Sequence, residues 1–186
     1  AASDVYKRQR IGSAAHPNET LRQLSLPALK EIKGDLCVYG TALQTADFKS
    51  LQSVAGHFVL QSDALLQLTA DELTTVAGNM TLIGTTADEA KAPCEQMYFP
   101  KLQRIDGTLT LSRFDRLSGL GTTFGVLTQA GALRYEHLAL ANTFEFPLIE
   151  TTGNITVTDC PILRSVLLPA LTDAGPLEIC LLYTSP

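Results

Sequence analysis

The chain has 186 residues, of which 45% are hydrophobic, and a formal net charge of −5. A chain of this length is expected to form one domain with a sizeable core. Its Lys and Arg residues are not clustered, which argues against nucleic-acid binding because that requires a basic surface. No apolar run approaches the length of a membrane span, so we expect no span within these residues.

The two ends of the chain do not fit the repeat that fills its middle. Residues 1–9 and 181–186 look like translated sequencing-adaptor sequence, and we leave both out of the fold prediction. The alternative is that residues 1–9 are an ordinary polar N-terminus and that residues 181–186 are the frayed end of the last repeat unit. We therefore expect an N-terminal segment over residues 1–23, partly artefactual, a single solenoid domain over residues 24–180, and an artefactual tail over residues 181–186.

Seven glycines mark an internal repeat, and they lie 22, 22, 29, 24, 22 and 22 residues apart: Gly34, Gly56, Gly78, Gly107, Gly131, Gly153 and Gly175. The residues two places after them are all apolar: Leu36, Phe58, Met80, Leu109, Leu133, Ile155 and Leu177. So are those four places after: Val38, Leu60, Leu82, Leu111, Tyr135, Val157 and Ile179. This alternation predicts one β-strand per unit, and such a unit buries its apolar face only by stacking on its neighbours.

The unit reads LxxIxGxLxV, and parity assigns its residues to an inner and an outer face. We expect the glycine to point inward with Ile32, Leu36 and Val38, at a bend or packing niche that allows close approach. The leucine position five residues before each glycine is filled by Leu29, Leu51, Leu73, Leu102, Val126, Leu148 and Ala170. A second inward position, nine residues after the glycine, is expected at Leu43, Leu65, Leu140 and Ile162. The predicted fold class is mainly β: a leucine-rich-repeat-like β-solenoid of about seven rungs of 22 residues with a parallel sheet.

The residues of opposite parity are expected to form three columns on the solvent face of this sheet. The first column holds Asp35, His57, Asn79, Thr108, Ala132 and Asn154. The second holds Cys37, Val59, Thr81, Thr110, Arg134 and Thr156. The third holds Tyr39, Gln61, Ile83, Ser112, Glu136 and Thr158.

The chemistry that these columns would support is limited. His57 beside Asp35 suggests an acid–base pair, but no serine or cysteine nucleophile stands in register to complete a triad. Cys37 lies diagonal to His57, a coincidence that neighbouring rungs are expected to produce. Arg134 and Glu136 are the only close charged pair on this face, which we interpret as an ordinary solvated pair. We therefore predict no catalytic residues and no enzymatic activity.

The four cysteines, Cys37, Cys94, Cys160 and Cys180, match no zinc signature, and the histidines are scattered. We expect no metal and no cofactor. In an extracellular chain Cys94 would reach Cys37 if residues 85–98 fold back over the outer face, and Cys160 would pair with Cys180 on the neighbouring rung. The alternative is that each cysteine is a free thiol.

Three sequons permit N-glycosylation in a secreted eukaryotic chain, at Asn18, Asn79 and Asn154. Asn79 and Asn154 share one register position, directly after a repeat glycine and facing outward. Glycans at both positions would cover part of the sheet, and that strip would then not be the binding surface.

The unit LxxIxGxLxV is often introduced by an aromatic residue or proline, as in Phe48–Leu51 and Phe99–Leu102. This pattern resembles the receptor L domain family, the ligand-binding solenoids of insulin-receptor-like and epidermal-growth-factor-receptor-like ectodomains, and similar repeats of fungal cell-surface wall proteins. The resemblance covers about residues 24–179 and is clearest over the first four units. It implies a right-handed solenoid at the cell surface or in the extracellular space.

The resemblance also implies a non-catalytic recognition or adhesion module that binds a protein or glycan partner. The expected contacts on the sheet are Asp35, Tyr39, His57, Gln61, Arg134 and Glu136. Two irregular insertions, residues 85–98 and 113–125, are further candidates because loops on rigid scaffolds carry specificity. The alternative is a structural cell-wall or surface solenoid. Minor alternatives are a carbohydrate-active β-helix enzyme and an ice-binding solenoid, although Ala132, Arg134 and Glu136 interrupt the threonine array that ice binding needs.

Overall fold

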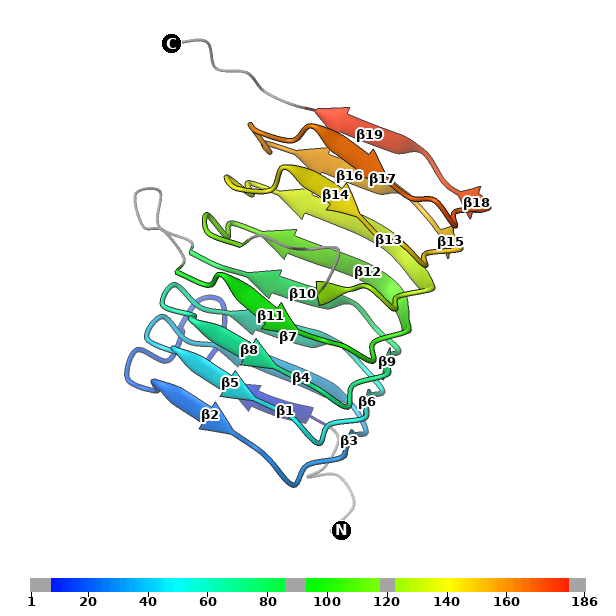
Figure 1. Ribbon diagram of the computed structural model, residues 1–186. Coiled ribbons are helices and arrows are strands. Elements are labelled where there is room, and N and C mark those ends of the chain that lie inside the picture. The colour runs from blue at the N-terminus through cyan, green and yellow to red at the C-terminus, as the bar shows by residue number, and fades with distance from the viewer. Residues whose placement is uncertain (1–7, 86–92, 118–122, 181–186) are drawn as a thin grey trace, which may run out of the picture.

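The computed structural model describes residues 8–85, 93–117 and 123–180. The chain winds into a parallel β-solenoid of about seven turns, as the repeat predicts. In Figure 1 the strands nearest the viewer run from left to right, those behind run from right to left, and the chain climbs from its N-terminal to its C-terminal end. The solenoid is therefore right-handed.

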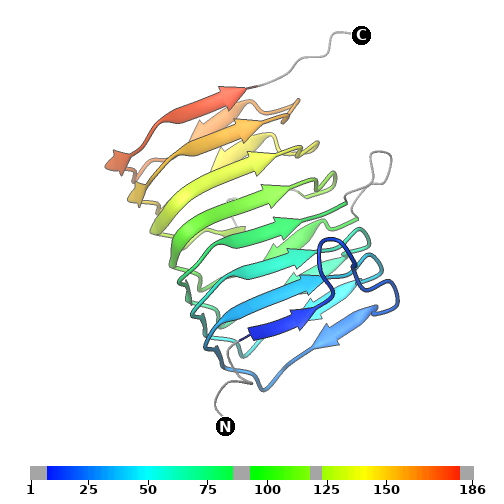
Figure 2. The same cartoon turned by 180° about the vertical axis from the view of Figure 1, so that it is seen from behind.

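The strands that follow the repeat glycines form the first face, a parallel sheet seen in Figure 2. In spatial order they are β1 (Arg8–Ile11), β4 (Asp35–Tyr39), β7 (Phe58–Gln61), β10 (Met80–Ile83), the second halves of β12 (Arg104–Ser112) and β13 (Gln129–Glu136), β16 (Ile155–Thr158) and β19 (Leu177–Cys180). The pairing of β1 with β4 sets Arg8 opposite Asp35. The sheet thus takes in part of the N-terminal segment, ahead of the first repeat unit.

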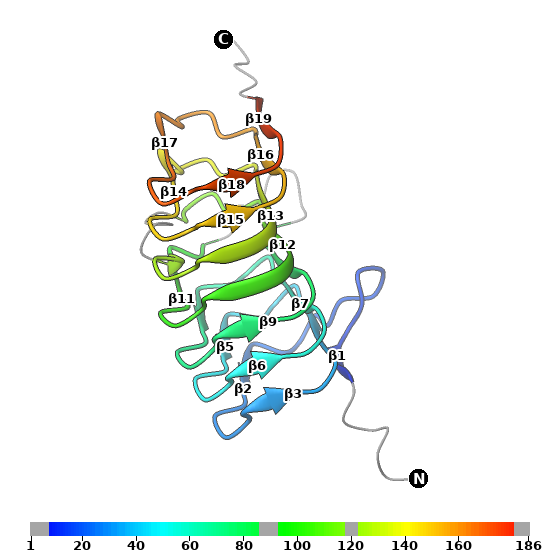
Figure 3. The same cartoon turned by 90° about the vertical axis from the view of Figure 1, so that its right-hand side faces the viewer.

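Two further sets of short strands complete each rung. The third face, seen in Figure 3, consists of β3 (Glu31–Ile32), β6 (Ser53–Val54), β9 (Thr75–Val76), the first halves of β12 and β13, β15 (Thr151–Thr152) and β18 (Asp173–Ala174). The second face consists of β2 (Gln23–Ser25), β5 (Thr45–Asp47), β8 (Gln67–Thr69) and β11 (Gln96–Tyr98), and of a separate pair, β14 (Thr143–Glu145) and β17 (Ser165–Leu167).

The register of the first face confirms the columns predicted from parity, except that Ser112 of the third column is buried rather than exposed to solvent. Leu36 and Val38 of β4 are buried, while Cys37 and Tyr39 between them are partly exposed. Each outward residue lies opposite its repeat equivalent, so that Cys37 pairs with Val59 and, further along, Thr110 pairs with Arg134. Every rung therefore adds one residue to each column.

The repeat glycines stack on one another at the corner between the third and first faces. The Gly78 N–H donates to the Gly56 carbonyl oxygen at 2.9 Å. A Cβ added at Gly78 would lie 2.7 Å from the Gly56 carbonyl carbon, closer than non-bonded atoms approach. The predicted close approach is confirmed, but its direction is corrected: the missing side chain would point along the stack toward the preceding rung, and Gly78 itself is half-exposed rather than inside the core.

A row of phenylalanines runs through the core from rung to rung. Successive ring centroids lie 5.5 to 6.4 Å apart along Phe48, Phe58, Phe99, Phe124 and Phe146. Aromatic pairs at these separations attract beyond the burial of their surface. They link consecutive rungs along the axis of the solenoid.

From Gly131 onward the inward positions before the first face shift by one residue relative to the glycine. Leu127 and Ile149 are fully buried, whereas Leu148, the residue in the predicted register, is 48% exposed. The cause is a β-bulge: Asp106 and Gly107 of β12 lie beside the single residue Gly131 of β13.

In the same rungs, one extra residue follows the first face and compensates for the residue lost before it. His137 and Asp159 adopt positive φ angles of 51° each, a left-handed conformation in which both residue types are enriched. Ala141 and Leu163, one place later than predicted, therefore point inward, and Leu140 and Ile162 are 50% and 42% exposed. The prediction that Leu140 and Ile162 fill the core is wrong, while Leu43 and Leu65 are buried as predicted.

Within the described ranges, the structure contains no helix with the length and apolar character that crossing a membrane requires.

Candidate functional site

The first outer column of the first face forms a ladder of hydrogen bonds between rungs. Asp35 Oδ1 accepts from the His57 backbone N–H, and His57 Nδ1 accepts from the Asn79 N–H, both at 2.9 Å. Asn79 Oδ1 in turn accepts from the Thr108 N–H at 2.9 Å. Two of the predicted contact residues, Asp35 and His57, thus hold successive rungs together at the edge of the first face.

Tyr39 and Gln61 lie side by side where β4 and β7 end. They are register partners in the parallel sheet, and both side chains are half-buried on its outer side. His57 is exposed to solvent. The structure therefore brings four of the six predicted contacts together: Asp35 and Tyr39 on β4, Gln61 on β7, and His57 directly before β7.

The other two predicted contacts, Arg134 and Glu136, form an ion pair on β13. Arg134 Nε donates to Glu136 Oε1 at 2.6 Å, and the arginine side chain is more than half exposed. An exposed pair of this kind contributes little to stability. Strands β10 and β12 separate this pair from Tyr39 and Gln61, so the predicted contacts form two patches on one face.

The three sequon asparagines occupy different settings. Asn79 and Asn154 are exposed on the first column, as their shared register predicts. Asn18 lies in the loop that precedes β2, where its Oδ1 accepts from the Leu21 N–H at 2.7 Å and from the Thr20 N–H at 3.1 Å. All three glycosylation assignments stay predictions.

The four cysteines form no disulfide in the described residues. Cys37 lies on the outer side of the first face and Cys94 in the core, so this structure does not bring that pair together. Cys180 lies opposite Thr158 and is exposed, while Cys160 is buried. Burial raises the pKa of the Cys94 thiol to about 11 and also raises the pKa of Cys160. Both buried thiols are held in the protonated, unreactive form at neutral pH.

The two predicted insertions lie only partly within the described residues, since residues 86–92 and 118–122 fall outside them. Residues 1–7 and 181–186, which cover most of the predicted adaptor sequence, also lie outside. The described part of the second insertion supplies core: Phe114, Leu117 and Phe124 are fully buried. Arg116 Nη1 of the second insertion lies 3.7 Å from Glu95 Oε1 of the first insertion, so the two segments meet beside the second face.

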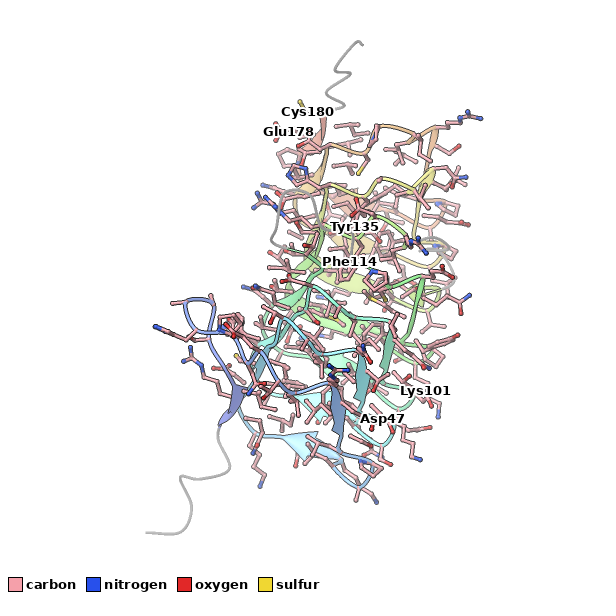
Figure 4. All side chains as sticks on the ribbon, turned by 90° about the vertical axis from the view of Figure 1, so that its left-hand side faces the viewer. Asp47, Lys101, Phe114, Tyr135, Glu178 and Cys180 are labelled. Carbon is pink, nitrogen blue, oxygen red and sulfur yellow. The ribbon has the colours of Figure 1, made fainter. Side chains whose placement is uncertain are left out.

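A polar depression on the second face was not predicted from the sequence. Strands β2, β5 and β8 align Gln23, Thr45 and Gln67 in one column and Ser25, Asp47 and Thr69 in the next. These side chains line a concavity of about 330 Å³. Figure 4 shows Asp47 on this side of the solenoid, with Glu178 and Cys180 on the last rung of the other.

A signal for this second surface exists in the sequence. Polar residues recur 11 and 13 places after the first two repeat glycines, on either side of an apolar one. Ala46 and Leu68 are those apolar residues, and both are buried. Strands of only three residues are too short for alternation alone to identify them.

Comparison of the chain with protein-family models, with curated proteins and with solved structures gives no match. No described group of three or more His, Cys, Asp or Glu side chains is arranged to hold a metal ion. The site is therefore interpreted from its own geometry, which offers two polar outer surfaces: the columns of the first face and the depression on the second face.

Proposed function

We propose that the protein is a non-catalytic recognition or adhesion module of the cell surface or extracellular space, similar to a receptor L domain, that binds a protein or glycan partner. The first face carries the proposal. Its outer side chains stand in straight columns, held by a parallel sheet and by the ladder from Asp35 to Thr108. A partner would meet a preorganised surface and lose little conformational entropy in ordering it.

The two patches of the first face suit contact with a protein. Tyrosine and arginine are enriched among the residues that dominate binding at protein interfaces. Tyr39 lies beside Gln61 on β4 and β7, and Arg134 with its partner Glu136 lies on β13, further toward the C-terminal end of the face. A partner that spans the face would contact both patches across β10 and β12.

A structural role in a cell wall or on a cell surface is the second candidate. It is favoured by the position of Asn79 and Asn154, which are exposed in the same column of the first face. A glycan on Asn79 would cover the sheet between the two patches, and one on Asn154 would cover it beyond Arg134, beside β16. The solenoid would then act as a spacer.

The test is a binding screen of the folded chain against arrayed extracellular protein domains and arrayed glycans. We expect a partner whose affinity falls about tenfold or more when Tyr39→Ala and Gln61→Ala are combined. The matched control is Gln52→Ala, an exposed glutamine outside the first face, which should leave the affinity unchanged. A chain that binds no member of either array would favour the structural role.

A further inference from the structure

We propose that the depression on the second face binds a neutral glycan, with the sugar chain running along the solenoid axis. The inference rests on the recognition function proposed above and assigns one ligand class to one surface. It starts from strands β2, β5 and β8, which lie on the opposite side of the solenoid from the first face (Figures 1 and 2). The side chains of these strands line the depression.

The depression offers hydrogen-bond groups of the kind that sugars require. Each sugar hydroxyl both donates and accepts, and glutamine amides and threonine or serine hydroxyls do the same. Ser25 Oγ donates to Asp47 Oδ2 at 3.2 Å, and Gln67 Nε2 donates to Thr69 Oγ1 at 3.3 Å. These contacts hold the side chains in place, and the remaining donors and acceptors of Gln67 and of the exposed Gln23 face solvent.

The spacing of the strands suits a polymer. Neighbouring strands of a sheet lie about 4.8 Å apart, a distance comparable to the length of one pyranose residue in an extended chain. Gln23, Thr45 and Gln67 stand at equivalent positions on three consecutive strands. Successive sugars along the axis would therefore meet successive members of the same column.

An aromatic residue extends the depression by one rung. Tyr98 of β11 lies opposite Thr69, and its side chain is exposed at 42%. Its hydroxyl donates to Gln96 Oε1, which fixes the ring at the surface. The ring presents a flat apolar face, and the C–H groups of a pyranose would stack against it.

Charge and polarity favour a neutral glycan over other ligands. The lining contains Asp47 and Asp71 against one cation, Lys49, so its negative balance disfavours anionic polysaccharides. Except for the buried Ala46, the lining residues are polar, whereas protein interfaces centre on buried aromatic or arginine anchors. The three strands carry no sequon, so glycans at Asn79 and Asn154 would leave this surface open.

The experiment is affinity electrophoresis of the folded chain in native gels that contain a soluble β-glucan, a mannan, a galactan or heparin. The test variant combines Gln23→Ala with Gln67→Ala. The matched control is Gln52→Ala, the same residue type at an exposed position outside both the first face and the depression. We expect at least one neutral polysaccharide to retard the chain and the double variant to raise its dissociation constant about tenfold. The control should behave as wild type, and all three chains should share one melting temperature.

Several results would overturn the inference. Retardation by none of the neutral polysaccharides, or by heparin alone, would exclude a neutral glycan. A loss of retardation in Tyr39→Ala with Gln61→Ala, but not in Gln23→Ala with Gln67→Ala, would move the glycan to the first face. Loss of binding to a protein domain in Gln23→Ala with Gln67→Ala would identify a protein ligand instead. In each case the recognition function would still stand if the arrays yield a partner that depends on Tyr39 and Gln61.

Discussion

Asn79 Oδ1 accepts a hydrogen bond from the backbone N–H of Thr108 at 2.9 Å. The two residues directly follow Gly78 and Gly107, the consecutive repeat glycines that lie furthest apart in the sequence. The same contact joins Asp35 to His57 and His57 to Asn79. This column therefore presents polar side chains to solvent and also fixes one rung on the next. Substitutions in it should change stability as well as binding.

Replacing Asn79 with alanine should destabilise the protein by about 0.5–1 kcal/mol, because the Thr108 N–H loses its acceptor at an exposed position. Asn79→Asp keeps an Oδ1 acceptor and removes the sequon, so its effect on stability should be smaller. Urea unfolding followed by circular dichroism measures both variants. Equal stability of Asn79→Ala and the wild type would show that the ladder does not hold the rungs.

Gly78→Ala should cost roughly 2 kcal/mol or more, because the new Cβ would lie 2.7 Å from the Gly56 backbone, which has no flexible end to move aside. Gly40→Ala is the matched control, since its Cβ would lie 3.4 Å from the nearest atoms, an ordinary contact. Thermal unfolding of both variants makes the comparison. Similar losses at the two positions would contradict a glycine stack.

Tyr135→Phe should stabilise the protein by about 1 kcal/mol. The Tyr135 hydroxyl is buried without a hydrogen-bond partner among the described residues, and such a group carries a desolvation penalty. The variant keeps the aromatic ring, whose centroid lies 4.6 Å from that of Phe144. Tyr98→Phe, which removes an exposed and hydrogen-bonded hydroxyl, should give no gain. A loss of stability in Tyr135→Phe would reveal a partner for the buried hydroxyl.

Stability should fall as the pH rises above about 9, because burial raises the pKa of the Cys94 thiol from 9.0 to about 11. The unfolded chain then releases its proton before the folded chain does, so the stabilisation is complete below pH 9 and is lost as the pH rises through 11. The expected loss at pH 10 is on the order of 1 kcal/mol.

The measurement for Cys94 is the free energy of unfolding at several pH values between 8 and about 10. Cys94→Ala should unfold more easily at pH 8 but with a shallower dependence on pH, because the titrating group is gone. Titration of Tyr135, whose pKa burial also raises, is common to both chains and cancels in the difference. Parallel pH profiles for the two chains would contradict the assignment.

The solenoid and the outer columns could be predicted because each rung repeats one strand in one register. Leu36 and Val38 are buried, and Cys37 lies opposite Val59, as parity alone requires. The first-face contact residues were found in the same way. What alternation could not reveal is that Asp35 and His57 also bond to backbone N–H groups of the next rung.

The misplaced core residues Leu140, Leu148 and Ile162 have one physical cause. The inward positions were predicted by counting from the glycines. Asp106 and Gly107 of β12 lie beside one residue of β13, so the later rungs have one residue fewer before the first face. They have one residue more after it, where residues such as His137 adopt a left-handed conformation. This exchange leaves the 22-residue spacing of the repeat glycines unchanged, so the repeat in the sequence does not reveal the exchange. Leu140 was therefore assigned to the core and is exposed.

The most direct measurement compares the affinity of three folded chains for the partner recovered from the arrays: the wild type, Tyr39→Ala with Gln61→Ala, and Gln23→Ala with Gln67→Ala. If the solenoid recognises its partner through an outer face, one double variant will weaken binding about tenfold at an unchanged melting temperature while the other binds as wild type. Wild-type affinity in both double variants would contradict recognition by either face.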